Sequence, residues 1–206
     1  ESEFRAFTAN DDNRLFTEVE ITNLKKHQLK IDNYLVEKNC AFLSEFYKSY
    51  NQAIERYKTS IETIQKEPFA FNSSETIEFS VKTFPYAKDE KDLKRLYKKR
   101  ILFHVLREVA ETSKNKDSLV ANFETLSKTA KDKVFESYLC KYSGLQLTEN
   151  DFVSKFYNAF CSYFDPHTVY LSESDKSSFL SNVSADNLSF GMIISMVEKE
   201  EIVVDE

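Results

Sequence analysis

Glycine and proline are scarce in this sequence. Only two glycines and three prolines occur among its 206 residues, and there is no tryptophan. Sandwiches and barrels need both residue types for their many turns, so the scarcity argues against such folds. No apolar run approaches the ~20 residues that cross a bilayer, so no membrane span is expected. With Lys, Glu and Leu abundant, the composition favours long helices.

Cysteine motifs and basic patches are also lacking. Cys40, Cys140 and Cys161 form no CxxC pair and have no histidine at metal-ligand spacing, so no metal or cofactor is expected. We expect Cys40 and Cys161 to be small core residues, because both fall within apolar helical patterns. The sequence leaves open whether Cys140 and Cys161 form a disulfide. A net charge of −6, with both signs interspersed, argues against a nucleic-acid surface.

The chain is instead rich in large apolar rings, with 18 Phe and 11 Tyr. These rings bury much area per residue and can form a substantial core. The clearest periodicity has spacings of three, four and seven, and its members are Leu35, Phe42, Phe46, Tyr50, Ile54, Tyr57, Ile61 and Ile64. It predicts one helix of roughly nine turns that ends before Pro68. A stripe of this length needs partners along the whole helix.

Further helices are predicted from capping residues and apolar periodicity. Thr8, Thr148 and Ser172 are expected to be N-caps, and Gly144 a C-terminal cap. The helix expected to end at residue 112 should be the most buried, because apolar residues cover more than one of its faces. The expected ranges are 8–30, from Asp89 or Asp92 to 112, 118–142, 148 to the turn at 165, and 172–183.

Residues 68–88 differ from these helical segments. Aromatic and branched residues alternate with polar ones there, and Pro68 and Pro85 bracket the segment. The alternation predicts an extended arm laid over the helices, or a short edge strand.

The histidines show no catalytic or metal-binding pattern. His104 falls on a mostly apolar helical face and is expected at the core or its rim. His27 stands among lysines and is expected to be solvated.

The pattern changes after residue 185. Residues 190–197 and 202–204 are rich in β-formers and predict a hairpin. An isolated two-stranded hairpin is marginally stable. We therefore expect a mainly α fold, with a helical domain over 1–184 and the start of a β-containing domain over 185–206.

Residues 164–172 place proline and histidine, two of the rarest residue types here, between two helical patterns. Pro166 restricts Asp165 to extended geometry, and an Asp in a turn accepts hydrogen bonds from nearby backbone N–H groups. A catalytic histidine would need a nucleophile within reach, and none is indicated. A structural hinge is therefore predicted, made of Asp165, Pro166, His167 and Thr168.

Residues 165–172, with the sequence DPHTVYLS, resemble the signature that precedes the PDZ domain in carboxy-terminal processing proteases. The resemblance is to the tail-specific proteases of bacterial envelopes. Residues 55–57 and 68–69 are similar to the long helix and following arm of that family. Residues 84–85 are similar to its aromatic-Pro start of the next helix, and residues 188–204 to the opening of its PDZ domain.

The resemblance implies a periplasmic serine protease that recognises the free C-termini of unfolded or tagged proteins, with a nucleophilic Ser and a Lys general base. The helical domain would shape substrate access, and an envelope adaptor protein could join it. The PDZ domain would bind the peptide by strand addition. No Ser or Lys in this sequence matches the catalytic pair, so this chain alone is expected to be inactive.

The resemblance also assigns a partial peptide-binding site. By position, its residues are Leu188, Gly191, Met192 and Ile193. The family usually has a second glycine nearby, which this sequence lacks, so an ordinary hairpin start is the alternative for this segment. For the whole chain, the alternative is a stand-alone helical adaptor whose aromatic grooves bind a partner helix or peptide.

Overall fold

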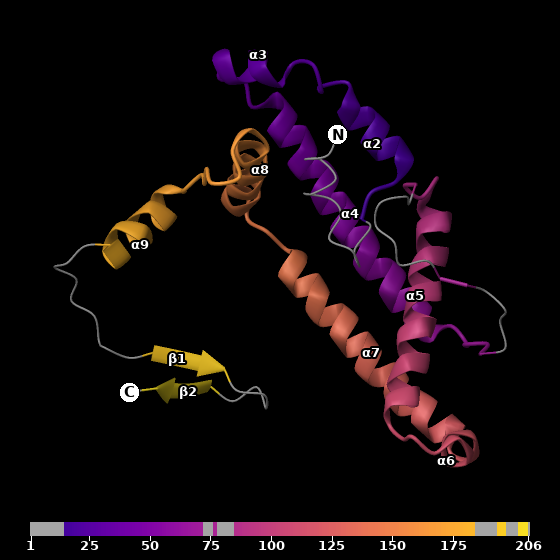
Figure 1. The fold of residues 1–206 in the computed structure, drawn as a ribbon. Helices are drawn as coiled ribbons and strands as arrows, with labels where there is room; N and C mark the ends of the chain where they lie inside the picture. Colours follow the sequence, from indigo (N-terminus) through magenta and orange to yellow (C-terminus); the bar gives the residue numbers. More distant parts are fainter. Residues whose placement is uncertain (1–14, 72–75, 78–84, 184–192, 197–201, 206) are drawn as a thin grey trace.

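The computed structural model describes residues 15–71, 76–77, 85–183, 193–196 and 202–205, and this part of the chain is mainly helical (Figure 1). The helices are α2 (Glu18–Lys25), α3 (Ile31–Val36), α4 (Ala41–Lys66), α5 (Glu90–Glu111), α6 (Lys116–Ala121), α7 (Phe123–Leu145), α8 (Glu149–Phe164) and α9 (Glu173–Val183). The strands β1 (Ile193–Met196) and β2 (Ile202–Asp205) pair antiparallel, with Ile193 opposite Asp205.

Helix α4 is the longest helix in the described part and the shared partner of most others. Its buried residues confirm the predicted stripe from residue 42 onward: Phe42, Phe46, Tyr50, Ala53, Ile54, Tyr57, Ile61 and Ile64. Helices α2, α3, α5, α7 and α8 all pack against α4 (Figure 1). One amphipathic helix therefore contributes to the core along its whole length.

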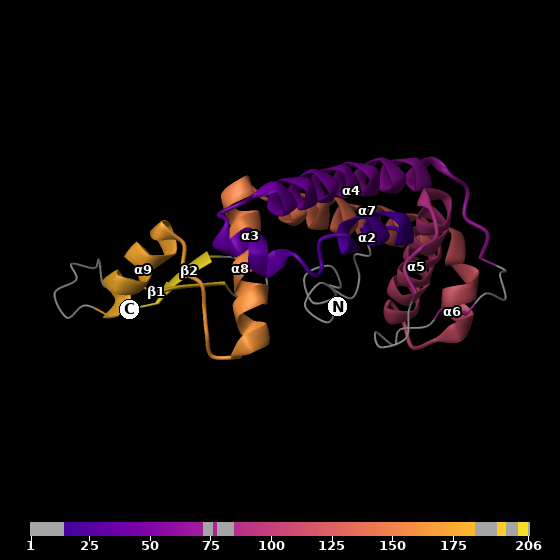
Figure 2. The ribbon, with the colours of Figure 1, turned by 90° about the horizontal axis from the view of Figure 1, so that it is seen from above.

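Helix α5 crosses α4 obliquely, and both helices proceed towards the same end of the body (Figures 1 and 2). At the start of α5, Glu90 lies 3.3 Å from Arg56 of α4. Further along α5, Lys98 lies 2.6 Å from Glu67, just after the end of α4. Because α5 begins beside the middle of α4 and not beside its end, the chain must return from Glu67 towards Arg56 before α5 starts. Residues 68–88 make this connection, which explains why so long a segment without helical periodicity separates the two.

Helix α7 runs antiparallel to α4. At one end, Lys131 donates to the backbone carbonyl of Glu67 over 3.3 Å. At the other end, the Tyr50 hydroxyl donates to the carbonyl of Leu145 over 2.8 Å. Burial raises the pKa of Tyr50 to about 12, so this hydroxyl keeps its proton and remains a donor at neutral pH. Helices α4, α5 and α7 thus form a three-helix body.

Helix α8 packs against the first half of α4 through aromatic rings. The rings of Phe46 and Phe152 meet edge to face at 4.9 Å between centroids, and those of Phe42 and Phe156 do so at 5.6 Å. Such geometry suits the ring quadrupoles. Thr148 caps α8 as predicted, accepting from the backbone N–H of Asp151.

The predicted first helix, 8–30, is wrong where the structure describes it. Thr8 lies outside the described residues, and the helix that is present begins at Glu18 with Thr17 as its N-cap. Thr17 and Glu20 form a capping box, because each side chain accepts from the other residue's backbone N–H. Glu18 N–H donates to the carbonyl of Ala87 over 2.8 Å, which fixes this helix start against the end of the connection.

Leu35 does not belong to the α4 stripe. It lies on the separate short helix α3 and is 44% exposed. Lys38 adopts φ 53°, in the left-handed region that ends right-handed helices. The break after residue 36 therefore separates Leu35 from the core face.

Two predictions for the middle of the chain also need correction. The segment 118–142 is not one helix, because Asn122 separates α6 from α7. Gly144 does not cap the helix from outside: it lies within the last turn of α7, and Gln146 ends the helix in extended backbone. Helix α5 is not the most buried helix either, with five buried residues against eight on α4.

Helix α9 lies to the side of the helical body, beyond α8, in both views (Figures 1 and 2). Its start confirms the predicted cap. The Ser172 hydroxyl accepts from the N–H of Asp175 over 3.2 Å, and the Asp175 carboxylate accepts from the N–H of Ser172 over 3.4 Å.

Candidate functional site

The turn between α8 and α9 is organised by Asp165. Its carboxylate accepts from the backbone N–H of His167 and from the hydroxyl of Thr168, both over 2.9 Å. Its backbone is extended, with φ −148° and ψ 118°, as the following proline requires. The His167 and Thr168 hydrogen bonds hold the pKa of Asp165 below its usual value. The turn is thus a specified structure with an ionised acceptor at its centre.

The chain after this turn folds back onto α8. The backbone N–H of Tyr170 donates to the side-chain oxygen of Asn158 over 2.9 Å. The rings of Tyr170 and Tyr157 lie 5.0 Å apart between centroids. The turn is therefore anchored to α8 two residues after Thr168.

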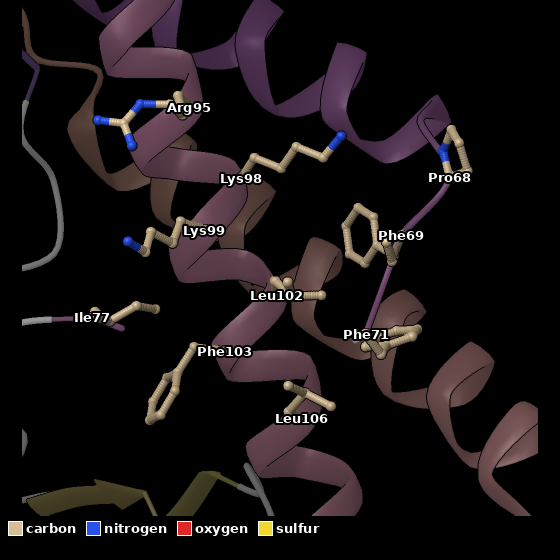
Figure 3. Close-up of a pocket in the computed structure, with 11 residues that line it drawn as sticks. Pro68, Phe69, Phe71, Ile77, Arg95, Lys98, Lys99, Leu102, Phe103 and Leu106 are labelled. Carbon is tan, nitrogen blue, oxygen red and sulfur yellow. The ribbon is translucent and has the colours of Figure 1, made fainter. Parts of the chain in front are cut away.

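A large pocket lies over α5, where the connection from α4 crosses it (Figure 3). Its volume is about 470 Å³. The lining residues are Pro68, Phe69, Ala70, Phe71, Ile77, Arg95, Lys98, Lys99, Leu102, Phe103 and Leu106. Phe69 and Phe71 pack partly against the core, so the first part of the predicted arm does lie over the helices. The rest of that prediction falls largely on residues 72–75 and 78–84, outside the described part.

A second pocket continues the first. Its lining residues are Ala70, Phe71, Leu106, Val109, Ala110, Leu119, Val120 and Phe123, and its volume is about 820 Å³. Ala70, Phe71 and Leu106 line both pockets. We call the two together the α5 groove. Sequence analysis did not assign this groove, because its residues come from the connection, α5, α6 and α7, which no single periodicity joins.

The charged side chains of the α5 groove gather at its first end. Arg95, Lys98 and Lys99 line this end. In Figure 3 the Lys98 side chain points towards Pro68, while those of Arg95 and Lys99 point to the opposite side of α5. Arg95 pairs with Asp92 at 2.8 Å, and Lys98 pairs with Glu67 at 2.6 Å. Neither carboxylate is among the residues that line the groove.

A largely buried ion pair joins α2 to α4. Both terminal nitrogens of Arg56 donate to the carboxylate of Glu20, over 2.7 and 2.8 Å, and one also donates to the carbonyl of Leu15. Burial acts to raise the pKa of Glu20, but the bonds from Arg56 and Thr17 outweigh it and leave the pKa lowered. Both carboxylate oxygens of Glu20 accept hydrogen bonds from within the chain, so we assign this pair a structural role.

One histidine lies where the sequence predicted it, and another does not. His104 is half-buried and contacts the Tyr138 hydroxyl over 3.1 Å, which confirms a position at the rim of the core. His27 is only 8% exposed, so the prediction of a solvated ring is wrong. Its ring nitrogens lie 2.9 Å from the Tyr34 hydroxyl and 3.1 Å from the Glu45 carboxylate. The lysines beside His27 in the sequence led to the prediction of an exposed ring, whereas the ring joins the α2–α3 segment to α4.

The cysteines are free thiols. Cys40 is exposed at the start of α4, so its assignment to the core is wrong, and Cys161 is half-buried. Cys140 is exposed and is not bonded to Cys161.

The sequence-predicted peptide-binding residues fall mostly outside the described part. Leu188, Gly191 and Met192 lie there, while the backbone of Ile193 begins β1. Among the described residues, no group of three His, Cys, Asp or Glu side chains is placed to hold a metal ion. The helices that are described include none with the length and apolar character of a membrane span.

Comparison with known protein families gives a match over most of the chain. The model of the tail specific protease N-terminal domain matches residues 9–174, about four fifths of the sequence. The match includes α2 to α8 and the Asp165 turn. A search of curated proteins found no match.

Proposed function

The chain belongs to the family of tail-specific protease N-terminal domains, and from this premise we propose that it is a non-catalytic region that shapes substrate access in a periplasmic serine protease. Proteases of this kind act on protein substrates. The single observation that carries the proposal is the anchored turn at residues 165–170. It couples α8 to the segment that follows, where a domain recognising free C-termini would sit.

The same proposal gives residues 185–206 as the start of a PDZ domain. The antiparallel pairing of β1 and β2 supports the start of a β-containing domain there. In this proposal Leu188, Gly191, Met192 and Ile193 offer backbone N–H groups to a substrate carboxylate. Asp165 and its three successors form the hinge between the two parts.

The direct test uses the gene product that contains this chain, read to its natural stop codon. It is incubated with an unfolded reporter that carries an apolar C-terminal tail, and the 206-residue chain is assayed alongside. We expect cleavage by the gene product and none by the 206-residue chain. An inert gene product would contradict the protease and favour the adaptor.

The role of the turn can be tested in the same assay. Asp165→Ala removes the acceptors for His167 and Thr168 and is expected to lower kcat/KM for the reporter. Asp117→Ala is the matched control, because Asp117 is exposed on α6, away from the turn. Equal kcat/KM for Asp165→Ala and the control would contradict the hinge.

A further inference from the structure

Helix α3 is weakly attached to the rest of the helical region. The structure describes all six of its residues, and none of them is buried. Val36 is 85% exposed, while Ile31 and Tyr34 pack against the core only in part. A helix of this length is not stable by itself in water. Its contacts with α4 therefore decide whether α3 stays in place.

The backbone departs from helical geometry on both sides of α3. Lys30, just before the helix, has φ −125° and ψ 0°. Lys38, two residues after the helix, has φ 53°, in the left-handed region. Segments that open locally have few buried apolar contacts and exposed backbone hydrogen bonds. Residues 30–38 fit this description.

A chain of side-chain hydrogen bonds joins α3 to α4. The Glu45 carboxylate of α4 lies 3.1 Å from Nε2 of His27, and Nδ1 of the same ring lies 2.9 Å from the Tyr34 hydroxyl of α3. Hydrogen bonds from Lys26 and His27 lower the pKa of Glu45, so its carboxylate is an ionised acceptor at neutral pH. In the neutral ring Nε2 then donates to Glu45, and Nδ1 accepts from Tyr34. We call Tyr34, His27 and Glu45 the α3 latch.

Helix α3 also forms one wall of a cleft of about 220 Å³. Tyr34 and Leu35 line the cleft from α3, Leu43 lines it from α4, and Phe156 and Tyr157 line it from α8. Every lining residue belongs to the described part of the chain. Movement of α3 away from α4 would widen the cleft and expose the two rings of α8.

We propose that α3 is a flap over this cleft and that the α3 latch holds the flap closed. When the Tyr34 hydroxyl leaves His27, α3 moves away from α4 as a unit. Helices α4 and α8 stay together, because the rings of Phe46 and Phe152 join them without α3. The flap thus controls access to the aromatic side of α8. The inference does not depend on the proposed protease function.

Hydrogen exchange of the 206-residue chain, resolved by NMR, tests the flap. The amides of Tyr34, Glu37 and Asn39 report its opening, because each donates a backbone hydrogen bond within this segment. We expect the three to exchange together, at a rate that low urea concentrations barely change, since local opening exposes little surface. Amides in the middle of α4 should exchange far more slowly. Exchange of both groups at one rate would overturn the flap.

The variant Tyr34→Phe removes the latch hydroxyl and keeps the ring. It should speed exchange of the three reporter amides about fivefold. Tyr142→Phe is the matched control, because it removes a hydroxyl of α7 that donates to Glu55 over 2.8 Å, and it should leave these rates unchanged. Equal rates in Tyr34→Phe and the unchanged chain would overturn the latch.

Glu45→Ala breaks the other end of the latch. It should also speed exchange of the reporter amides. Because both changes act through His27, the rate increase in the double variant with Tyr34→Phe should be smaller than the product of the two single increases. Increases that multiply would show two independent bonds and would overturn the latch as one unit.

A thiol within the cleft provides a second measurement. With Cys40, Cys140 and Cys161 replaced by serine, Leu43→Cys places a single thiol on the α4 wall of the cleft. Its rate of reaction with a bulky maleimide is compared with and without Tyr34→Phe. The rate should rise by the same factor as amide exchange, because one opening equilibrium governs both. An unchanged reaction rate would overturn the flap.

Discussion

Replacing Phe46 by alanine would remove the ring at the centre of the contact between α4 and α8. Phe46 is fully buried, with ring centroids of Phe152, Phe42 and Phe16 at 4.9, 5.7 and 6.0 Å. A buried Phe→Ala change costs about 3–5 kcal/mol through lost transfer energy and the cavity left behind. These rings come from α8, from α4 itself and from the segment before α2, so collapse of the cavity would require all three to move. We therefore expect about 4 kcal/mol.

Urea unfolding followed by far-UV circular dichroism measures this loss, and thermal unfolding gives an independent reading. At ~2–4 °C per kcal/mol for a chain of this size, Tm should fall by about 8–16 °C. Phe179→Ala is the matched control, because that ring is 53% exposed on α9, and its effect should stay within about 0.5 kcal/mol. A loss below about 1 kcal/mol for Phe46→Ala would refute the assignment of the α4 core face.

Three further predictions concern the ion pair and the anchored turn. Arg56→Leu should lower the free energy of unfolding at neutral pH by about 2–3 kcal/mol, because Glu20 stays half-buried without its partner. Arg107 is exposed, and an equal loss of stability in Arg107→Leu would contradict this prediction. The folded pKa of Glu20 is lowered, so its stabilisation is complete above the unfolded pKa of ~4.3 and is lost as pH falls through the folded pKa. Stability below about pH 4 should therefore fall more steeply in the unchanged chain than in Arg56→Leu, and parallel curves would contradict the sign. Asn158→Ala should speed amide hydrogen exchange at Tyr170 by up to about tenfold, and an unchanged rate would show that the N–H is not held.

The elements that sequence predicted well are those with strong local signals. The stripe from Phe42 to Ile64 repeats over six turns, and only a helix can place those residues together. Asp89, Thr148 and Ser172 combine a capping side chain with a following acidic residue, and each begins a helix in the structure. These signals involve residues within four positions, so no tertiary contact is needed to interpret them.

The errors arose where a distant contact decides the outcome. The start of α2 is an exception, because the Thr17–Glu20 capping box is a local signal; the Glu18 N–H also donates to the carbonyl of Ala87, almost 70 residues later. His27 is buried because Tyr34 and Glu45 receive its ring, although its immediate neighbours are charged. The α5 groove draws its walls from four segments, so its existence depends on packing that periodicity does not report.

The contacts of α4 also constrain how this chain is made on the ribosome. Tyr47 and Tyr50 bond to backbone carbonyls 100 and 95 residues later, at Leu147 and Leu145. Synthesis at ~5–20 residues per second delays those partners by about 5–20 s. Throughout that interval the apolar stripe of α4 is synthesised but lacks α7 and α8. During that interval α2, α3 and α5 are the partners of α4 already synthesised among the described helices, so the part of the stripe that α7 and α8 later cover stays exposed on the nascent chain.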